Sequence, residues 1–182
     1  MAKVATPRER WVEEGLRALA DGGTGAVRIE ALAKELGVTK GGFYWHFDDR
    51  RALLDAMLDA WEQEGVDDVI AQVDADGGDG RTRLRDLFAL AMALPERLPI
   101  ELAVRDWARR DEAVQARLAR VDDRRFDFMR RLFGEICTDA DEVEVRCFLA
   151  FNVWVGQSFV AASHGTRSRA AVINASLEYL LA

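Results

Sequence analysis

The stretch GVTKGGFYWHF, residues 37–47, places two adjacent glycines inside what its flanks predict to be a short helix, and then crowds aromatic rings behind them. Glycine is a poor helix former and costs about 1 kcal/mol relative to alanine in a helix interior. A chain that keeps two glycines in so short a helix is expected to use the space that a side chain would fill. The sequence around the pair indicates what that use is.

Two short helices joined by a turn are predicted here. The first covers about residues 28–36, because its apolar residues fall on one face. Gly37 ends it as a left-handed C-cap does, and Thr39 is a good N-cap for a second helix of about 39–45. A helix, a short turn that contains glycine and a second helix make a helix-turn-helix, whose second helix lies in the DNA major groove.

The apolar residues fit the packing of such a unit. Ala33 is small where the two helices cross, Val38 is expected to fill the crevice between them, and Phe43 is expected to return to the core. Phe47 is expected to point inward as well. These rings would hold a short helix that propensity alone cannot hold.

The polar residues of the same stretch supply candidate DNA contacts. Gly41 and Gly42 leave little bulk, so the backbone can come close to phosphates and base edges. Hydroxyls, cations and rings with polar tips can reach the phosphates that flank the groove. For Trp45, surface packing and DNA contact both stay open, and Arg50, at the start of the next helix, is expected to meet a phosphate. The candidate DNA-binding residues are Arg28, Thr39, Lys40, Gly41, Gly42, Tyr44, Trp45, His46 and Arg50.

The charge of the chain is unevenly distributed. The formal net charge of the 182 residues is −7. Residues 1–51 hold nine Lys or Arg against eight Asp or Glu, whereas residues 52–182 hold sixteen against twenty-four. The acidity belongs to the second part, so a DNA contact can still be local to the first. Since no run of 18 apolar residues and no secretion signal are present, we expect a cytoplasmic protein without a membrane segment.

The fold class predicted for the chain is all-α, because helix formers dominate and no convincing alternating strand is found. Thr6 as N-cap and Pro7 at the first helical position start the first helix. Further helices are expected at about 49–75, 81–94, 100–109, 111–135, 140–163 and 167–181, which makes about nine in all. The expected domains are a three-helix DNA-binding domain over 1–50 and a ligand-binding and dimerisation bundle over 51–182, joined by the helix at 49–75.

Enzyme and metal sites are not supported by the residues. A di-iron bundle needs two Glu-x-x-His units, but Phe43 and Ala161 stand three residues before the two histidines, His46 and His164. No G-x-S-x-G nucleophile motif occurs. We therefore predict no catalytic residue, no metal and no cofactor.

The segment IEALAKELGVTKGGFYWHFDDRRALL, residues 29–54, closely resembles the helix-turn-helix signature of the TetR family of transcriptional regulators. The resemblance covers roughly the first 60 residues. Residues on strong family positions are Lys40, Gly41, Tyr44 and Phe47. The chain departs from the pattern at Arg28, where the family usually has Ser or Thr, and at Arg50, where it usually has Lys.

The resemblance implies a homodimer that is joined through its last two helices. The chain agrees, because the helix expected at 140–163 is apolar nearly all round between Cys147 and Ala162, as a helix between its own core and a partner would be. A purely monomeric core helix is the alternative. Two reading helices in a dimer would recognise a palindromic operator in double-stranded DNA. The predicted interface residues are Asn152, Val155, Gly156, Phe159, Ile173, Leu177 and Leu180.

The resemblance also implies a small-molecule effector that is bound by the second domain. Candidate pocket residues, each also explained as plain core, are Phe88, Met92, Trp107, Arg125, Phe126, Met129, Phe151 and Trp154. Arg125 lies on an otherwise apolar line of its helix, where a charge needs a partner. That partner is either an Asp within the fold or an anionic ligand.

The function predicted from these observations is a sequence-specific DNA-binding transcriptional regulator, and the family resemblance favours a repressor that the effector releases from its operator. The alternative is a helical ligand-binding or interaction module without DNA-binding activity.

Overall fold

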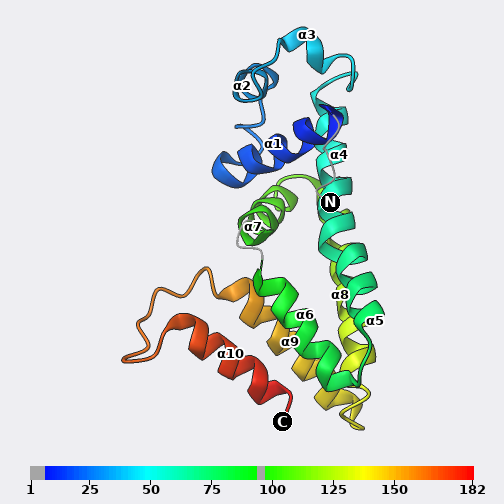
Figure 1. Cartoon of the computed structure of the whole chain (residues 1–182), viewed down its shortest axis with the longest axis vertical. Coiled ribbons are helices and arrows are strands. Elements are labelled where there is room, and N and C mark those ends of the chain that lie inside the picture. Colours follow the sequence, from blue (N-terminus) through cyan, green and yellow to red (C-terminus); the bar gives the residue numbers. More distant parts are fainter. Residues whose placement is uncertain (1–6, 94–96) are drawn as a thin grey trace. The chain divides into compact units, whose positions relative to one another are not determined.

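The computed structural model of the chain describes residues 7–93 and 97–182, and every regular element in this part is a helix (Figure 1). The elements are α1 (Pro7–Gly22), α2 (Ile29–Glu35), α3 (Lys40–Phe43), α4 (Arg50–Glu62), the π-helical turn η1 (Gln63–Asp67), α5 (Asp68–Asp76), α6 (Gly80–Ala93), α7 (Arg97–Ala108), α8 (Glu112–Phe133), α9 (Ala140–Gly156) and α10 (Arg169–Leu180). Because α4, η1 and α5 follow one another without a gap, residues 7–93 and 97–182 form nine continuous helical segments. The predicted all-α fold class is confirmed.

The helices form two compact units. Unit 1 comprises Met1–Gly65 and Glu96–Arg120, and unit 2 comprises Val66–Pro95 and Val121–Ala182. Unit 1 therefore holds α1 to α4, α7 and the first part of α8, whereas unit 2 holds α5, α6, the rest of α8, α9 and α10. The expected functional division into residues 1–50 and 51–182 stays a prediction.

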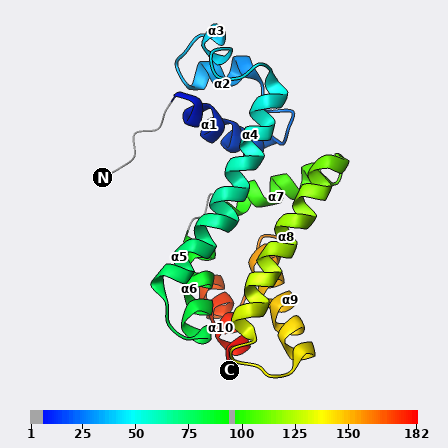
Figure 2. The same ribbon diagram turned by 90° about the vertical axis from the view of Figure 1, so that its right-hand side faces the viewer.

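Unit 1 is built on α1, which packs against α2, α4 and α7, while α2 packs against α3 (Figures 1 and 2). The apolar face of α1 is buried, because Trp11, Leu16 and Leu19 recur at helical spacing. A Cβ atom on Gly15 would lie 2.7 Å from the sulfur of Met57 in α4. The absence of a side chain at Gly15 therefore lets α1 and α4 approach closely.

Capping residues fix the ends of α2, α3 and α4, and those at Gly37 and Thr39 were predicted. Gly37 has a φ of +68°, and the N–H of Val38 donates to the Ala33 carbonyl at 2.9 Å, which is the Schellman arrangement. The Thr39 side chain accepts from the Gly42 N–H at 3.3 Å, and Asp49 accepts from Ala52 N–H at 2.8 Å. The N-cap predicted at Thr6 lies outside the described residues.

The ring of Phe43 anchors α3 in the core of unit 1. Its side chain is 0% exposed and packs edge-on against Trp11, with ring centroids 5.2 Å apart, and stacked on Phe47, at 5.3 Å. The inward positions predicted for both Phe residues are confirmed. The prediction for Val38 is wrong, because this side chain is 45% exposed. Val38 closes the Schellman turn through its backbone N–H, so its side chain is left at the surface.

A buried carboxylate in unit 1 was not foreseen. Glu101 of α7 is almost completely buried, accepts a hydrogen bond from the indole N–H of Trp61 in α4 at 2.9 Å, and pairs with Arg105 at 2.7 Å. A buried charge is tolerated when it is paired and hydrogen-bonded in this way. The group therefore ties α7 to α4.

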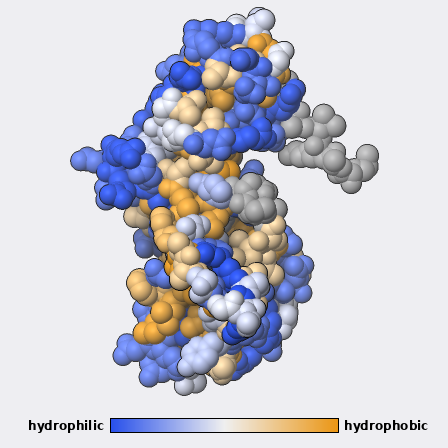
Figure 3. All heavy atoms as spheres, turned by 90° about the vertical axis from the view of Figure 1, so that its left-hand side faces the viewer, coloured by the Kyte–Doolittle hydropathy of each residue, from blue (hydrophilic) through white to orange (hydrophobic). Residues whose placement is uncertain are grey.

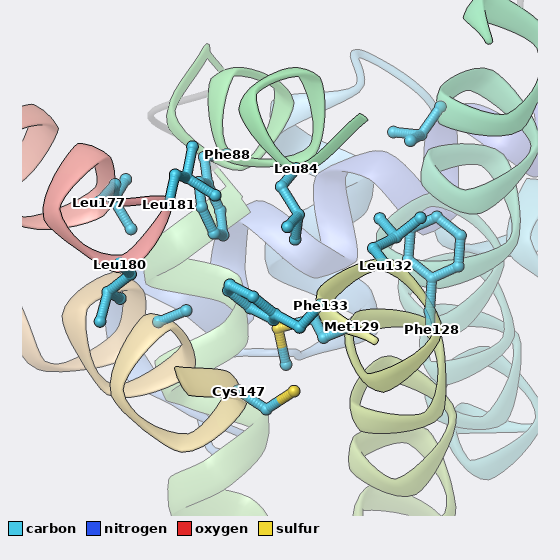
Figure 4. Close-up of a cluster of buried hydrophobic side chains, with 12 residues drawn as sticks. Leu84, Phe88, Phe128, Met129, Leu132, Phe133, Cys147, Leu177, Leu180 and Leu181 are labelled. Carbon is cyan, nitrogen blue, oxygen red and sulfur yellow. The ribbon is translucent and has the colours of Figure 1, made fainter. Parts of the chain in front are cut away.

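Unit 2 has its own apolar core (Figure 4). Its side chains come from α5, α6, α8, α9 and α10, and those of the last four helices meet in Figure 4. The labelled members are Leu84, Phe88, Phe128, Met129, Leu132, Phe133, Cys147, Leu177, Leu180 and Leu181. Burial raises the pKa of the Cys147 thiol to about 12, so this cysteine is a protonated core residue.

The helix predicted at 140–163 is too long, because α9 ends at Gly156 and residues 157–168 form turns and irregular chain. Side chains satisfy the carbonyls at this end. The amide of Gln157 donates to the Trp154 carbonyl at 2.9 Å, and Arg169 donates to the Gln157 carbonyl at 2.7 Å. Conversely, α7 begins earlier than predicted, since Pro99 fits the first turn of a helix, where its missing N–H costs no bond.

We predict that Phe43→Ala lowers the free energy of unfolding by about 3–5 kcal/mol, because it removes a completely buried ring. Trp45→Ala, two residues away, removes a larger ring that is 86% exposed, and should change it by no more than about 0.5 kcal/mol. Urea unfolding followed by circular dichroism measures both. Equal losses for the two variants would show that α3 is not held by Phe43.

Candidate nucleic-acid interface

The loop and helix that follow α2 present most of the predicted DNA-binding residues to solvent. Arg28, which precedes α2, and Thr39 and Lys40, at the start of α3, are exposed. Tyr44 and Trp45, directly after α3, are exposed. His46, Gly42 and Arg50 are half-buried. One short helix and the residues that flank it thus present hydroxyl, ammonium and aromatic groups to solvent, while Phe43 faces the core.

The structure gives no internal reason for the glycine pair. A Cβ atom on Gly41 would meet only the Thr39 hydroxyl, at 3.7 Å, and one on Gly42 would meet the same atom at 3.8 Å, which are ordinary contacts. Neither glycine has a positive φ. Alanine would therefore fit in the free protein and would favour the helix. The outer surface of α3 thus lacks side chains at Gly41 and Gly42, although neither packing nor backbone conformation requires glycine there. We call this surface bare.

Lys40 does not stand alone on this surface. Its ammonium lies 2.5 Å from a carboxylate oxygen of Glu30 in α2. The hydrogen bond between them lowers the pKa of Glu30 and raises the pKa of Lys40, and the charge of Arg28 lowers the pKa of Glu30 further. Glu30 was missed as a site residue, because its partner lies ten residues further along the chain, across the turn.

Arg50 makes two contacts within unit 1 that were not predicted. Its Nε donates to the Val27 carbonyl at 2.6 Å, and its Nη2 donates to the Thr24 carbonyl. Both carbonyls belong to the segment between α1 and α2, which lies beside the first turn of α4. The guanidinium therefore holds that segment in place, and the phosphate contact expected of Arg50 stays a prediction.

The predicted effector residues fall into three groups. Phe88 and Met129 belong to the core of unit 2 (Figure 4), and Trp107 is buried in unit 1. The others form one cluster in unit 2, which we call the Trp154 cluster. Its members are Met92, Arg125, Phe126, Phe151 and Trp154. Trp107 thus belongs to a different unit from the rest.

Aromatic contacts connect the Trp154 cluster. The ring of Phe151 lies 5.3 Å from that of Phe126 and 5.5 Å from that of Trp154, between centroids. Gln157 donates to the Met92 sulfur at 3.3 Å and so joins it to the same end of α9. The buried indole N–H of Trp154 has no hydrogen-bond partner among residues 7–93 and 97–182. A buried donor without a partner is costly, and a ligand oxygen would satisfy it.

Arg125 has the internal partner that was one of its two predicted options. It pairs with Asp122 at 3.3 Å, one helical turn away, and its guanidinium carbon lies 5.3 Å from the Trp154 ring centroid. A cation over an indole face is stabilised by the ring quadrupole. The side chain is thus placed beside the indole ring of Trp154.

The predicted dimer residues divide between core and surface. Leu177 and Leu180 are buried in the core of unit 2, and Ile173 packs against it. Val155 and Gly156 are half-buried, Asn152 is exposed, and Phe159 is exposed but lies beyond the end of α9. The two leucines therefore face the protein's own interior, because the apolar stripe of α10 is used to pack against α6, α8 and α9.

A different apolar stripe faces outward on α9. Val145, Phe148 and Leu149 are 45–60% exposed and recur with Asn152 at helical spacing, opposite the buried Cys147. On α10, Ala171, Ala175 and Tyr179 are exposed at four-residue intervals. Figure 3 shows that hydrophobic side chains (orange) reach the surface on the face drawn there. The sequence pattern could not separate this stripe from the buried face, since both are apolar.

An open pocket in unit 2 carries none of the predicted site residues. It has a volume of about 530 Å³ and is lined by Arg130, Gly134, Cys137, Thr138, Ala140, Val143 and Glu144. Within the described residues, no group of three His, Cys, Asp or Glu side chains could hold a metal ion. In the same part of the chain, no helix is both long enough and apolar enough to cross a bilayer.

An all-α chain with a capped helix, a glycine turn and a second short helix near its N-terminus has the helix-turn-helix class of fold. Residues 12–57 match the family model described as bacterial regulatory proteins, tetR family. The chain is 42% identical over 53 residues to tetracycline repressor protein class C from Escherichia coli, a match that covers 29% of this chain and 24% of that protein. It therefore matches about a quarter of the length of this curated relative.

Solved structures extend the likeness over the whole chain. A transcriptional regulator from Rhodococcus sp. Rha1 has a TM-score of 0.74 at 17% identity, with 97% of this chain and 94% of that chain covered. AibR in complex with isovaleryl coenzyme A and operator DNA has a TM-score of 0.69 at 18% identity, with 95% and 98% covered. At these identities the likeness shows the fold. Residues 12–57 are thus similar to the tetR-family domain, and the chain as a whole has the fold of these solved regulators.

Proposed function

We propose that the protein is a sequence-specific DNA-binding transcriptional regulator that reads the major groove with α3 and works in the cytoplasm. The bare surface at Gly41 and Gly42 carries the proposal. Two glycines in a four-residue helix weaken that helix, and nothing inside the protein requires them. They are useful if a second surface must come within backbone distance of α3, and the groove of a duplex is such a surface.

The side chains around the bare surface suit a duplex. The Thr39 hydroxyl and the Lys40 ammonium can donate to phosphate or base oxygens, and the exposed Tyr44 and Trp45 carry polar tips on rigid rings. Arg28 adds a cation at the start of α2. The relatives support the same use, because one of them is a tetracycline repressor and another, AibR, was solved in complex with operator DNA.

We propose that the regulator acts as a homodimer that is joined through α9 and α10. The outward stripe of Val145, Phe148 and Leu149 would then be covered by a second copy. Apolar stripes of this kind are costly when they are left in water and usually mark an interaction surface. The small exposed residues on α10, Ala171 and Ala175, allow a partner helix to approach closely. A dimer presents two α3 helices and would read a palindromic operator.

We propose that the effector binds at the Trp154 cluster and releases a repressor from its operator. The unpaired indole N–H of Trp154 and the neighbouring Arg125 guanidinium favour a ligand that has an apolar body and an oxygen acceptor. AibR, which has the same fold, binds isovaleryl coenzyme A. Such a ligand would shift the protein toward a state with lower DNA affinity only if it binds that state more tightly.

We predict that Gly41→Ala and Gly42→Ala have opposite effects on the stability of the protein and on its affinity for DNA. Each should raise the free energy of unfolding, by up to about 1 kcal/mol, because alanine favours the helix. Each should weaken binding to a duplex selected from a random pool by the wild-type protein, by about tenfold or more, because a methyl group keeps the backbone away from the groove. Urea unfolding and fluorescence anisotropy measure the two effects.

The matched control for this pair is Gly25→Ala. Gly25 lies between α1 and α2, with a φ outside the positive region and nothing within 4 Å of an added Cβ. Its substitution should leave DNA affinity unchanged. The proposal is wrong if the two α3 variants bind the selected duplex as tightly as the wild type does, or if the wild type binds no duplex at all.

We predict that Phe148→Glu converts the dimer to a monomer, because a carboxylate in the centre of the stripe would be buried without a partner. Gln115→Glu adds the same charge to an exposed position of α8 in unit 1 and should leave the dimer intact. Sedimentation velocity at micromolar concentration distinguishes the two. A Phe148→Glu protein that still sediments as a dimer would place the interface elsewhere.

A further inference from the structure

Glu30 places a negative charge on the surface that is proposed to meet a polyanion. Its side chain is 67% exposed, and the Lys40 side chain, with which it forms an ion pair, is 52% exposed. An exposed pair of this kind adds little stability. An acidic residue next to the phosphate backbone also opposes binding. A structural role therefore does not account for Glu30. The remaining explanation is the effect of its carboxylate on Lys40.

The pair changes what Lys40 can do. In the free protein the ammonium is engaged by a carboxylate at hydrogen-bond distance, 2.5 Å. A phosphate of an arbitrary duplex offers Lys40 another oxygen anion, but it must displace Glu30 and approach its charge. The gain that a free lysine would obtain from each phosphate contact is thereby largely cancelled.

A base edge with both an acceptor and a donor can satisfy the two side chains together. In the major groove a G·C pair presents O6 and N7 of guanine as acceptors and the N4 amino group of cytosine as a donor. Guanine O6 and cytosine N4 are hydrogen-bonded to each other, so they lie about 2.9 Å apart. This spacing is close to that between the Lys40 ammonium and the Glu30 carboxylate. The ammonium would donate to guanine while the carboxylate accepts from cytosine.

We propose that Glu30 is a specificity-determining residue of the DNA-reading surface. It restrains Lys40 on unselected DNA, and together with Lys40 it reads one G·C base pair in each half-site. This inference rests on the proposed DNA-binding function. It assigns to α2 a part in base recognition, in addition to that of α3, and it explains why a DNA-binding surface keeps an exposed carboxylate.

The test uses Glu30→Gln in the full chain, with two duplexes of equal length, one selected by the wild type and one of scrambled sequence. Binding to the scrambled duplex should become several-fold tighter, and the slope of log K against log salt should steepen by about 1.8, since each of the two subunits gains one more phosphate contact. The preference for the selected duplex should fall by about tenfold or more, with the loss concentrated at one G·C position.

Two further variants make the result specific. Lys40→Met should abolish the effect of Glu30→Gln on the salt slope, because no ammonium is left to release. Glu35→Gln makes the same charge change on α2, about 140° around the helix, and should leave the slope unchanged. Circular dichroism should show all variants folded, with unfolding midpoints close to that of the wild type.

The outcomes separate this inference from the function on which it rests. A wild type that binds no duplex refutes the DNA-binding function. A wild type that discriminates, together with a Glu30→Gln protein that has the same slope and the same preference, overturns the role of Glu30 alone. Two further results would also overturn the role of Glu30, because they would show a general effect of charge. One is a Glu30→Gln effect that is unchanged in the Lys40→Met background, and the other is an equal effect of Glu35→Gln.

Discussion

The burial of Phe43 is the interaction on which the proposed DNA-reading surface depends. A four-residue helix with two glycines cannot hold itself in water. The ring of Phe43, enclosed by Trp11 and Phe47, fixes this helix to α1, and the Thr39 cap and the Gly37 turn fix its direction. Because these inner contacts fix the position of α3, its outer side needs no large side chains to stabilise it. The glycines are thus tolerated because the core, and not helix propensity, holds α3 in place.

Other backbone contacts fix the segments on either side of α2. Arg50 holds the segment before α2 through two backbone carbonyls, and the Schellman turn at Gly37 links α2 to α3. The side chains that remain on the outside include several with polar groups at their tips, among them Lys40, Glu30 and Tyr44. The rigid inner contacts therefore present a small set of outer groups at fixed positions, as recognition of a regular helix such as DNA requires.

Features set by neighbouring residues could be predicted from the sequence, and features set by distant residues could not. The caps at Thr39 and Asp49, the turn at Gly37 and the burial of Phe43 follow from local chemistry. The contacts of Arg50 span 23 and 26 residues, and the Glu30–Lys40 pair crosses a turn, so periodicity carried no sign of them. In α9 and α10 the residues are apolar on several faces, and only the packing of unit 2 shows that Leu177 faces inward while Phe148 faces outward.

Methylation protection tests most directly whether the glycine surface of α3 lies in the major groove. Dimethyl sulfate modifies N7 of guanine in the major groove and N3 of adenine in the minor groove. On a duplex selected by the protein, we expect two clusters of protected guanines about one helical turn apart, with adenine N3 still reactive between them. Bound protein that leaves every guanine N7 reactive, or that protects adenine N3 alone, would contradict a major-groove position for α3.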